Sequence, residues 1–565
     1  MPIYEKYVGR NRDDFKSLED AQKNYKLTYD ESFNFAYDVI DVLGTEKPDK
    51  LAMVWVSNDE EVKRFTFRDF MLMSNKAANY LKSLGIKKGD KVLLVLKRSY
   101  LFWVLTLGLH KIGAVMIPAT NMLKAKDYVY RCNVAKIKCV IITGDGECTQ
   151  YYDEGEGKYE TVEMKMVTKH KAAGEGWIDF EAGYEAASDV WQRPTGDEAT
   201  NIHDVQMIAF SSGTTGYPKI ITHDFTYPLG HIMTGVFWHR VVDGGLHFTV
   251  SDSGWMKCMW GKFYGQWFGE TALFVYDFEK FDGKKILEMI ERFKITTFCV
   301  PPTMYRFILQ NDVSKYDLSS LVHCCTAGEA LNPDIFNKWK EATGLEIYEG
   351  FGQSETPVCL ATIYPWCKPV PGAMGYPVPG LDVHVLDENG NHCQRGTTGE
   401  ICIRYESTDN HPCGVLTGYN FSKEDTDRAI HDGFYHTGDT AYRDELGMFR
   451  YVGRNDDVIK SSGYRIGPFE IESVLMEHPA VLEVAVTGVP DPVRGFNVKA
   501  TIVLRPGFTG SDELVKELQN YVKKNTAPYK YPRVVEFVDE LPKTFSGKIG
   551  RVAIRENDKK KLEEK

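Results

Sequence analysis

Apolar and polar residues alternate with two different periods along the first part of the chain. Short apolar runs typical of buried strands occur at 51–56 (LAMVWV), 91–96 (KVLLVL) and 138–143 (KCVIIT). Between them, apolar residues recur with the period of an amphipathic helix over 67–84 and again from Tyr100 onward. Strands that alternate with helices predict parallel sheets with helices on both faces.

The alternation returns after residue 270 and then changes. The runs at 271–276 (TALFVY), 296–301 (TTFCVP) and 345–352 (LEIYEGFG) have strand character, and 283–294 (GKKILEMIERFK) has helix character. We interpret this region as a second doubly wound unit, in which ligands bind at the carboxyl ends of the strands. From 372 to 455, apolar runs separated by Gly, Asp and Asn turns predict antiparallel strands instead.

A smaller unit is predicted to begin near Asp456. Its expected elements are a helix over 468–476, strands over 482–490 and 499–506, and a helix over 512–524. The fold class is therefore α/β. We expect a large N-terminal domain (1–455) of doubly wound sheets with a β-rich subdomain, followed by a small, mobile α+β C-terminal domain (456–565).

Composition narrows the class of protein. A chain of 565 residues is too long for a single core, and its net charge of -11 disfavours nucleic acid and anionic membranes as partners. The twelve cysteines have no zinc-type spacing, so we expect reduced, buried thiols. The amino terminus lacks a signal or transit pattern, and the longest apolar stretch, 101–109, is too short to span a membrane. These features predict a cytoplasmic protein without integral membrane contact. A homodimer is compatible with them.

A loop at 211–219 (SSGTTGYPK) has the glycines, hydroxyls and lysine of a phosphate-binding turn. It follows the strand-like run VQMIAF, so its backbone N–H groups are available to an anion. The spacing is GxxGxxK, and Pro218 and Ile220 flank Lys219, so the loop is not a Walker A motif. Taken alone, the segment is also compatible with a flexible loop.

Four further segments accompany this loop in order. They are YEGFGQSE (348–355), YHTGD (435–439), GRNDDVIKSSGYRIGPFEIE (453–472) and PKTFSGKIGR (542–551). Together the five segments resemble the motifs of the acyl-adenylate-forming superfamily, over about residues 30 to 560. The segment at 251–267 (SDSGWMKCMWGKFYGQW) is most similar to medium-chain acyl-CoA synthetases.

The resemblance implies an ATP site. Lys548 would be the catalytic cation on the α-phosphate, Glu355 would hold Mg²⁺, and Asp439 would accept hydrogen bonds from the ribose hydroxyls with help from Arg454. Thr214 of the loop is a further catalytic candidate. Alone, these residues would be a surface lysine, a capping acid, a turn aspartate and a surface arginine. The other expected ATP-binding residues are Ser211, Ser212, Gly213, Thr215, Gly216, Tyr217, Pro218, Lys219, Gly328, Glu329, Glu349, Gly350, Phe351, Gly352, Gln353 and Ser354.

The small domain is expected to bind coenzyme A after a rotation at the hinge residue Asp456. Arg494 and Lys523 are candidates for the CoA phosphates, although a basic run is also compatible with a solvated face. The residues expected to face the CoA channel are Ser462, Gly463, Tyr464 and Arg465.

The resemblance also predicts the size of the acid substrate. Acetate-specific relatives carry a tryptophan where this chain has Gly352, so the pocket should admit larger acids, with Trp260 at its far wall. Phe351 and Ser354 stand where relatives have Tyr and Thr, and Ser354 keeps the hydroxyl. The expected substrate is a linear, branched or aryl carboxylic acid of intermediate size.

The predicted function is that of an ATP-dependent acyl-CoA synthetase. A carboxylate and ATP give acyl-AMP and pyrophosphate, and CoA then displaces AMP to form the acyl-CoA. ATP, Mg²⁺ and coenzyme A are the implied cofactors. Two alternatives remain open at this point: an adenylating enzyme with another acyl acceptor, and a non-enzymatic nucleotide-binding sensor.

Overall fold

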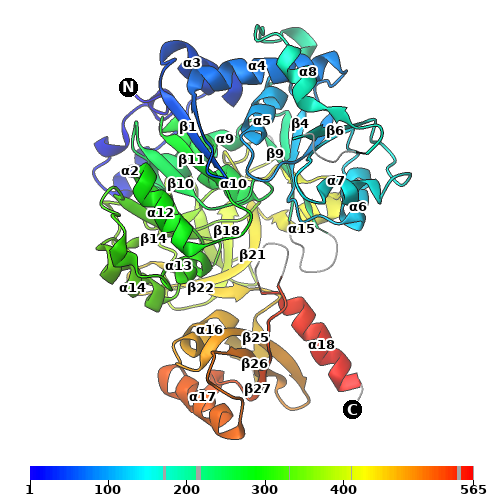
Figure 1. Ribbon diagram of the computed structural model, residues 1–565. Helices are drawn as coiled ribbons and strands as arrows, with labels where there is room; N and C mark the ends of the chain where they lie inside the picture. The colour runs from blue at the N-terminus through cyan, green and yellow to red at the C-terminus, as the bar shows by residue number, and fades with distance from the viewer. Residues whose placement is uncertain are drawn as a thin grey trace.

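The computed structural model describes residues 1–169, 174–211, 218–329, 331–408, 410–462, 464–543 and 549–563. The chain forms a large body with three sheets and a small body with one, as the α/β prediction requires (Figure 1). The last strand of the large body is β22 (Phe449–Arg454), and β23 (Ile459–Ser461) belongs to the small body. The predicted boundary at 455/456 falls between these strands and stays a prediction.

One sheet of the large body has nine strands and is parallel from β14 to β1. In spatial order they are β16 (Tyr376–Pro377), β15 (Leu360–Ala361), β14 (Ile347–Phe351), β13 (His323–Ala327), β12 (Thr297–Cys299), β10 (Leu246–Thr249), β11 (Ala272–Asp277), β1 (Leu51–Ser57) and β2 (Val62–Thr66). Met53 of β1 lies opposite Leu273 of β11. The sequence pattern groups the run at 51 with the first unit. The structure places it in the second, because local periodicity carries no information on long-range pairing.

The second sheet has eight strands and supplies the phosphate-loop candidate. In spatial order they are β19 (Gly418–Tyr419), β9 (Ile220–Asp224), β8 (Val205–Phe210), β4 (Val115–Pro118), β3 (Lys91–Val95), β5 (Cys139–Thr143), β6 (Met164–Thr168) and β7 (Ile178–Asp179). β8 and β9 pair antiparallel, with Phe210 opposite Ile220. The loop at 211–219 therefore joins the two strands of a hairpin, and the Ser211 N–H donates to the Lys219 carbonyl at 3.0 Å.

The remaining sheets form the β-rich subdomain and the small body. The subdomain sheet is antiparallel, as the turn pattern predicts, and contains β22 together with β17 (Val383–Leu386), β18 (Gly399–Arg404), β21 (Phe434–Arg443) and β20 (Ile430–His431). The sheet of the small body contains β23, β24 (Tyr464–Ile466), β26 (Gly495–Leu504), β25 (Val481–Asp491) and β27 (Val534–Phe537).

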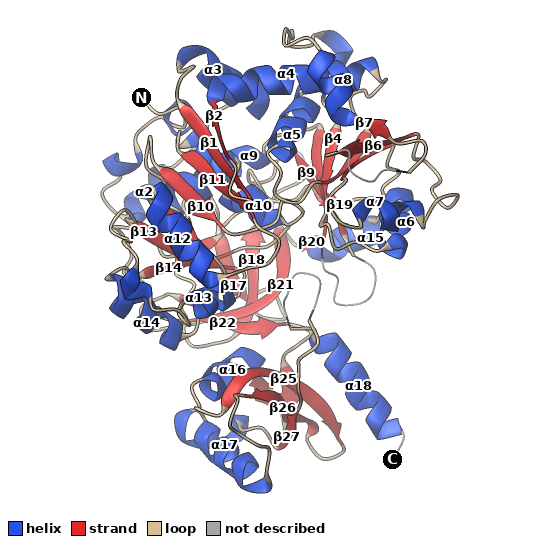
Figure 2. Cartoon of the chain, viewed as in Figure 1, coloured by secondary structure: helices blue, strands red, loops and turns tan. Residues whose placement is uncertain are grey.

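Helices cover the sheets of both bodies (Figure 2). Those of the large body are α1 (Glu5–Val8), α2 (Leu18–Asn24), α3 (Val42–Glu46), α4 (Phe67–Ser83), α5 (Leu101–Ile112), α6 (Ala125–Val134), α7 (Cys148–Asp153), α8 (Phe180–Ala186), α9 (Tyr227–Ile232), α10 (Met256–Gly261), α11 (Tyr264–Phe268), α12 (Gly283–Phe293), α13 (Pro302–Ile308), α14 (Pro333–Thr343) and α15 (Lys423–Ala429). Those of the small body are α16 (Pro468–Met476), α17 (Asp512–Asn525) and α18 (Arg551–Glu563). Within the described residues, no helix combines the length and apolar character needed to cross a membrane.

Local sequence explains the best-defined helices. Thr66 and Asp69 form a capping box at the start of α4, which fixes the point where strand β2 turns into helix. α5 is buried on all sides, which explains its nearly continuous apolar sequence. The twelve cysteines are free thiols, and all except Cys413 are buried, as their spacing predicts.

Candidate nucleotide and acyl-transfer site

A buried carboxylate on β21 lies at the centre of the candidate site. Asp439 is only 5% exposed, and its neighbour in the register of β22 is Arg454. Its Oδ1 accepts a hydrogen bond from the Tyr451 hydroxyl at 3.0 Å, and its Oδ2 accepts one from Gln353 Nε2 at 2.5 Å. Arg454 Nη1 lies 3.7 Å from Oδ2. The structure therefore brings together the two residues that the sequence assigns to the ribose.

Arg454 also joins this carboxylate to the hinge candidate. Its Nε lies 3.6 Å from Asp456 Oδ1, and the N–H of the intervening Asn455 donates to the Gly438 carbonyl at 2.8 Å. Burial by itself lowers the pKa of Arg454, but the charges of Asp439 and Asp456 raise it above its ordinary value. The guanidinium thus stays charged, and a rotation at residue 456 would change its surroundings directly.

The metal-ligand candidate, Glu355, lies in the loop after β14. Its Oε1 accepts a hydrogen bond from the Tyr419 hydroxyl at 3.1 Å. Burial raises the pKa of Glu355, while the Tyr419 bond and the charges of Arg454 and Lys219 lower it in part. Lys219 Nζ lies 4.7 Å from the centre of the Tyr419 ring, so the end of the phosphate loop contacts the tyrosine that binds Glu355.

The donor set fits a magnesium ion. Carboxylate oxygen is the ligand that Mg²⁺ prefers, and the ion usually keeps several waters beside one or two protein carboxylates. Glu355 has its second oxygen, Oε2, beyond the one that accepts from Tyr419. A dication at this carboxylate would also favour its charged form, which burial disfavours.

Gln353 holds Asp439 through an amide hydrogen bond. Besides its bond to Asp439, its Nε2 donates to the Thr437 carbonyl at 2.8 Å, and its Oε1 accepts from the Tyr435 hydroxyl at 2.8 Å. The carbonyl of the next residue, Ser354, accepts a hydrogen bond from His223 Nε2 at 2.9 Å. Burial lowers the pKa of His223 to about 4, so this imidazole is neutral at physiological pH. The side chain of Gln353 thus positions Asp439, and its predicted contact with ATP stays a prediction.

Glycines in the motif at 348–355 allow indole rings to approach the backbone. A Cβ on Gly350 would lie 2.6 Å from the Trp238 ring, and one on Gly352 would lie 2.4 Å from Trp260 Cη2. The sequence argument treats Gly352 as an open space. In the structure, the Trp260 ring and the Pro357 carbonyl both lie against this position, so a larger residue at 352 would collide with them. The two predicted pocket residues are therefore in direct contact.

The adenine candidates lie at the ends of β13 and β14. Gly328 has a φ of 102°, a conformation that glycine adopts without strain, and Glu329 Oε2 accepts a hydrogen bond from Thr303 at 2.7 Å. Lys257 Nζ donates to the Ala327 carbonyl at 2.7 Å. Lys257 was missed by sequence reasoning, although it sits within the segment used for the family resemblance.

The CoA candidates gather on one region of the small body. Ser462 Oγ accepts a hydrogen bond from Arg494 Nη1 at 3.1 Å. The ring of Tyr464 stacks on Tyr529 at 4.1 Å with an interplanar angle of 15°, and half of the Tyr464 surface is exposed. Lys523 Nζ lies 4.0 Å from the centre of the Tyr531 ring. A flat aromatic surface beside basic groups suits a nucleotide with phosphates.

Several predicted residues lie outside the described part of the chain. They are Ser212, Gly213, Thr214, Thr215, Gly216, Tyr217, Gly463, the side chain of Arg465, and Lys548. The segment that carries Lys548 is nevertheless anchored at its base. The Gly550 N–H donates to the Pro542 carbonyl at 2.7 Å, and Arg551 Nη2 bonds both oxygens of Glu472 at 2.7 Å. Arg551 and Arg555 also pair with Asp457, the neighbour of the hinge candidate.

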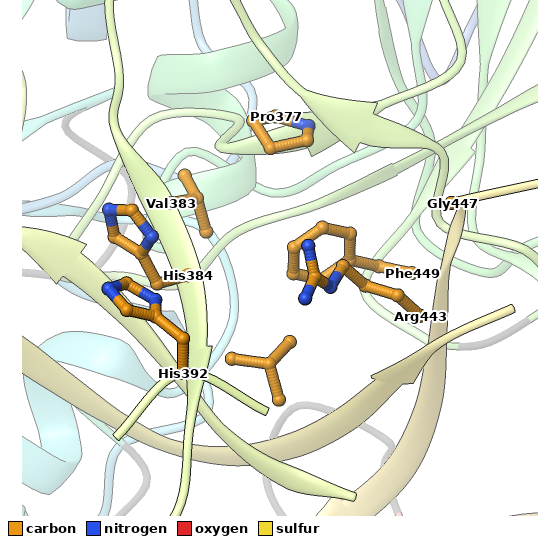
Figure 3. A pocket seen from close by; sticks show the side chains of 8 residues that line it. Pro377, Val383, His384, His392, Arg443, Gly447 and Phe449 are labelled. Atoms are coloured by element: carbon orange, nitrogen blue, oxygen red, sulfur yellow. The ribbon is translucent and has the colours of Figure 1, made fainter. Parts of the chain in front are cut away.

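A separate pocket of about 140 Å³ opens at the other end of β21 (Figure 3). Arg443, His384, His392 and Phe449 contribute to its walls. Arg443 Nη2 donates to the Cys393 carbonyl at 2.5 Å. Because no residue predicted for ATP, CoA or the acid lines it, this pocket is not the candidate site.

The site has Arg454 beside Asp439, and both Glu355 and Lys219 beside Tyr419. This arrangement suits a nucleotide-dependent, adenylate-forming class of enzyme. The chain belongs to the AMP-binding enzyme family: that family's model matches residues 42–419, and the model of the AMP-binding enzyme C-terminal domain matches 470–548.

Individual relatives agree with this assignment. The chain is 39% identical over 566 residues to acyl-coenzyme A synthetase ACSM3, mitochondrial, of Mus musculus, covering 98% of this chain and 96% of the relative. Among solved structures, the anthranilate CoA ligase AuaEII in complex with anthranoyl-AMP has a TM-score of 0.85 at 28% identity, covering 94% and 99% of the two chains. The acyl-CoA synthetase of Brucella canis has a TM-score of 0.73 at 31% identity, covering 97% and 99%.

These findings confirm the superfamily, the α/β fold and the function of an ATP-dependent acyl-CoA synthetase that forms AMP. They contradict the predicted cytoplasmic location, because the acyl-CoA synthetase relatives from mouse, rat and human are named as mitochondrial. Composition and the first residues of the chain therefore do not predict the location of this protein correctly.

Proposed function

We propose that the enzyme divides its two half reactions between the carboxylate cluster of the large body and the aromatic, basic surface of the small body. The observation that supports this most strongly is that protein hydrogen bonds hold both acidic side chains in place. Tyr419 binds Glu355, and Gln353 and Tyr451 bind Asp439. The domain boundary at 455/456 and the hinge at Asp456 belong to the same proposal.

In the first half reaction the substrate carboxylate attacks the α-phosphorus of ATP and pyrophosphate leaves. Asp439 holds the ribose hydroxyls, and Arg454 pairs with this carboxylate. Lys219 and Lys548 offset the negative charge that builds on the phosphoryl oxygens. Glu355 would hold Mg²⁺, which when bound would offset the negative charge of the phosphates.

In the second half reaction the thiol of CoA attacks the acyl-adenylate carbonyl and AMP leaves. This step needs room where pyrophosphate was, so Lys548 has to withdraw. Rotation at Asp456 would break the contact between Asp456 and Arg454 and bring Tyr464 and Arg494 toward the site. The arrangement of Arg494 beside Ser462 supports a phosphate contact for this pair.

The acid is proposed to be of intermediate size and linear, branched or aryl. The indole of Trp260 touches the backbone at Gly352, so a long straight chain would have to displace it. A compact branched or aromatic group needs less depth for the same apolar contact. Because the relatives are named as mitochondrial, we also propose a mitochondrial location, which fractionation of the source cells with antibody detection would test.

Substitution of the terminal lysine tests the division of labour. Lys548→Ala should lower carboxylate-dependent exchange of pyrophosphate into ATP by about a hundredfold or more, since a charged group is lost from the transition state. The same variant should still form acyl-CoA from supplied acyl-adenylate and CoA. The matched control is Lys543→Ala. Lys543 lies in the same segment as Lys548 and pairs with Glu483. Full exchange activity in the Lys548 variant would refute the proposal.

A further inference from the structure

Three side chains with metal-ligating atoms meet on the face of the subdomain sheet that points away from the main core. Glu400 and Cys402 are two residues apart on β18, and His436 lies directly opposite Cys402 on β21. The two strands are neighbours in the subdomain (Figure 1). Alternate residues of a strand point to the same face. Ile401 and Ile403, on the other face of β18, belong to the main hydrophobic core.

The distances from His436 to the other two ligand atoms match those of a metal centre. His436 Nδ1 lies 3.2 Å from Glu400 Oε2 and 3.5 Å from Cys402 Sγ, and all three atoms lie within 4.8 Å of one another. Zinc bonds of about 2.0–2.1 Å to nitrogen or oxygen and about 2.3 Å to sulfur put tetrahedral ligands about 3.3–3.6 Å apart. Two of the three edges therefore already have the required length.

A second contact orients the carboxylate. Glu400 Oε1 accepts the Gly438 N–H at 2.8 Å, which leaves Oε2 facing His436. Such outer contacts fix the direction of a ligand and raise metal affinity. Gly438 immediately precedes Asp439, so the cluster lies directly behind the turn that carries the ribose candidate.

We propose that Glu400, Cys402 and His436 bind a divalent transition metal of the zinc class, with water in the fourth position. The mixture of sulfur, nitrogen and oxygen ligands selects such an ion over Mg²⁺, which takes oxygen ligands in an octahedral arrangement. This site is separate from the one at Glu355. A metal bound there links β18 to β21 and restrains the turn at Gly438 and Asp439.

Cobalt(II) provides a test that does not depend on activity. The full-length protein, stripped of metal with a chelator and kept reduced, is titrated with Co²⁺ while near-ultraviolet and visible absorbance are recorded. We expect one equivalent to bind with a thiolate-to-cobalt charge-transfer band and the visible bands of a tetrahedral ion. Added Zn²⁺ should remove both signals by displacement.

Substitutions identify the ligands. Cys402→Ser should abolish the charge-transfer band, and Glu400→Gln, whose amide oxygen can still accept the Gly438 N–H, should weaken Co²⁺ binding about tenfold or more. Cys367→Ser is the matched control, because this buried thiol lies outside the cluster, and it should bind as the parent does. Absence of the band in the parent protein, or its persistence in Cys402→Ser, would overturn the proposal and leave an ordinary pair of His436 and Glu400.

Discussion

Tyrosine hydroxyls hold the polar side chains of the nucleotide site in place. The motifs at 348–355 and 435–439 could be recognised from sequence, but the partners of their side chains could not. Each hydroxyl donates to a side chain from another segment of the chain. Which segments come together depends on the tertiary fold, and a local sequence pattern does not contain that information. The pairs are Tyr419 with Glu355, Tyr435 with Gln353, and Tyr451 with Asp439.

Glu349 is the acidic residue of the site whose surroundings differ most from water. It is 4% exposed on β14, and its Oε2 has no hydrogen-bond partner within the described residues. Burial raises the pKa of Glu349 to about 8, although the Leu331 N–H and the charge of Arg450 lower it in part. The folded protein thus keeps a proton that the unfolded chain releases near its ordinary pKa of 4.5.

This difference predicts a pH dependence of stability. Because the native state binds the extra proton, the free energy of unfolding falls as the pH rises from about 5 to about 8. Glu349→Gln removes this contribution, so the variant should gain stability relative to the parent as the pH increases over that range. Denaturant unfolding at pH 5, 6.5 and 8 measures it, with the exposed Glu341→Gln as control. A constant difference between variant and parent at all three pH values would contradict the assignment.

At the scale of elements, periodicity located most helices and strands but not their partners. The helix over 468–476 matches α16 residue for residue, and the antiparallel character of the 372–455 region is present. The placement of β1 failed because β1 pairs with β11, more than two hundred residues away. Gly352 shows the same limit within the site, since its missing side chain is replaced by a ring from α10.

The contact between α10 and the loop after β14 predicts the range of acids. Trp260→Gly removes the ring that touches Gly352, so acids longer by two methylenes should gain roughly tenfold in kcat/KM relative to the parent's preferred acid. Trp260→Phe keeps an aromatic ring in place and should change the profile much less. Acyl-CoA formation across a series of linear acids measures the shift. An unchanged profile in Trp260→Gly would show that this ring does not close the acyl pocket.

At the scale of the whole molecule, the two bodies meet near the hinge through packing as well as charge. The rings of Tyr451 and Phe469 lie 6.2 Å apart, and charged residues flank the hinge candidate. Asp456 contacts Arg454 of the large body, whereas its neighbour Asp457 pairs with Arg551 and Arg555 of α18. Adjacent carboxylates therefore face different bodies. A backbone change at this point would break the contact of Asp456 with the large body and keep the contacts of Asp457 within the small body. A hinge between two domain orientations requires this property.

If the CoA-binding surface of the small body serves only the second half reaction, substitutions there should weaken CoA binding and leave the rate of adenylation unchanged. Arg494→Ala removes the guanidinium beside Ser462, and the loss of one charged hydrogen bond should raise the KM for CoA about tenfold. Pyrophosphate exchange should stay at the parental rate, since adenylation is complete before CoA binds. Lys516→Ala removes an exposed charge from α17 and should change neither quantity, which separates a local contact from the general field of the domain. An Arg494 variant with slow exchange and an unchanged KM for CoA would place this residue in adenylation and reverse the assignment of the two surfaces.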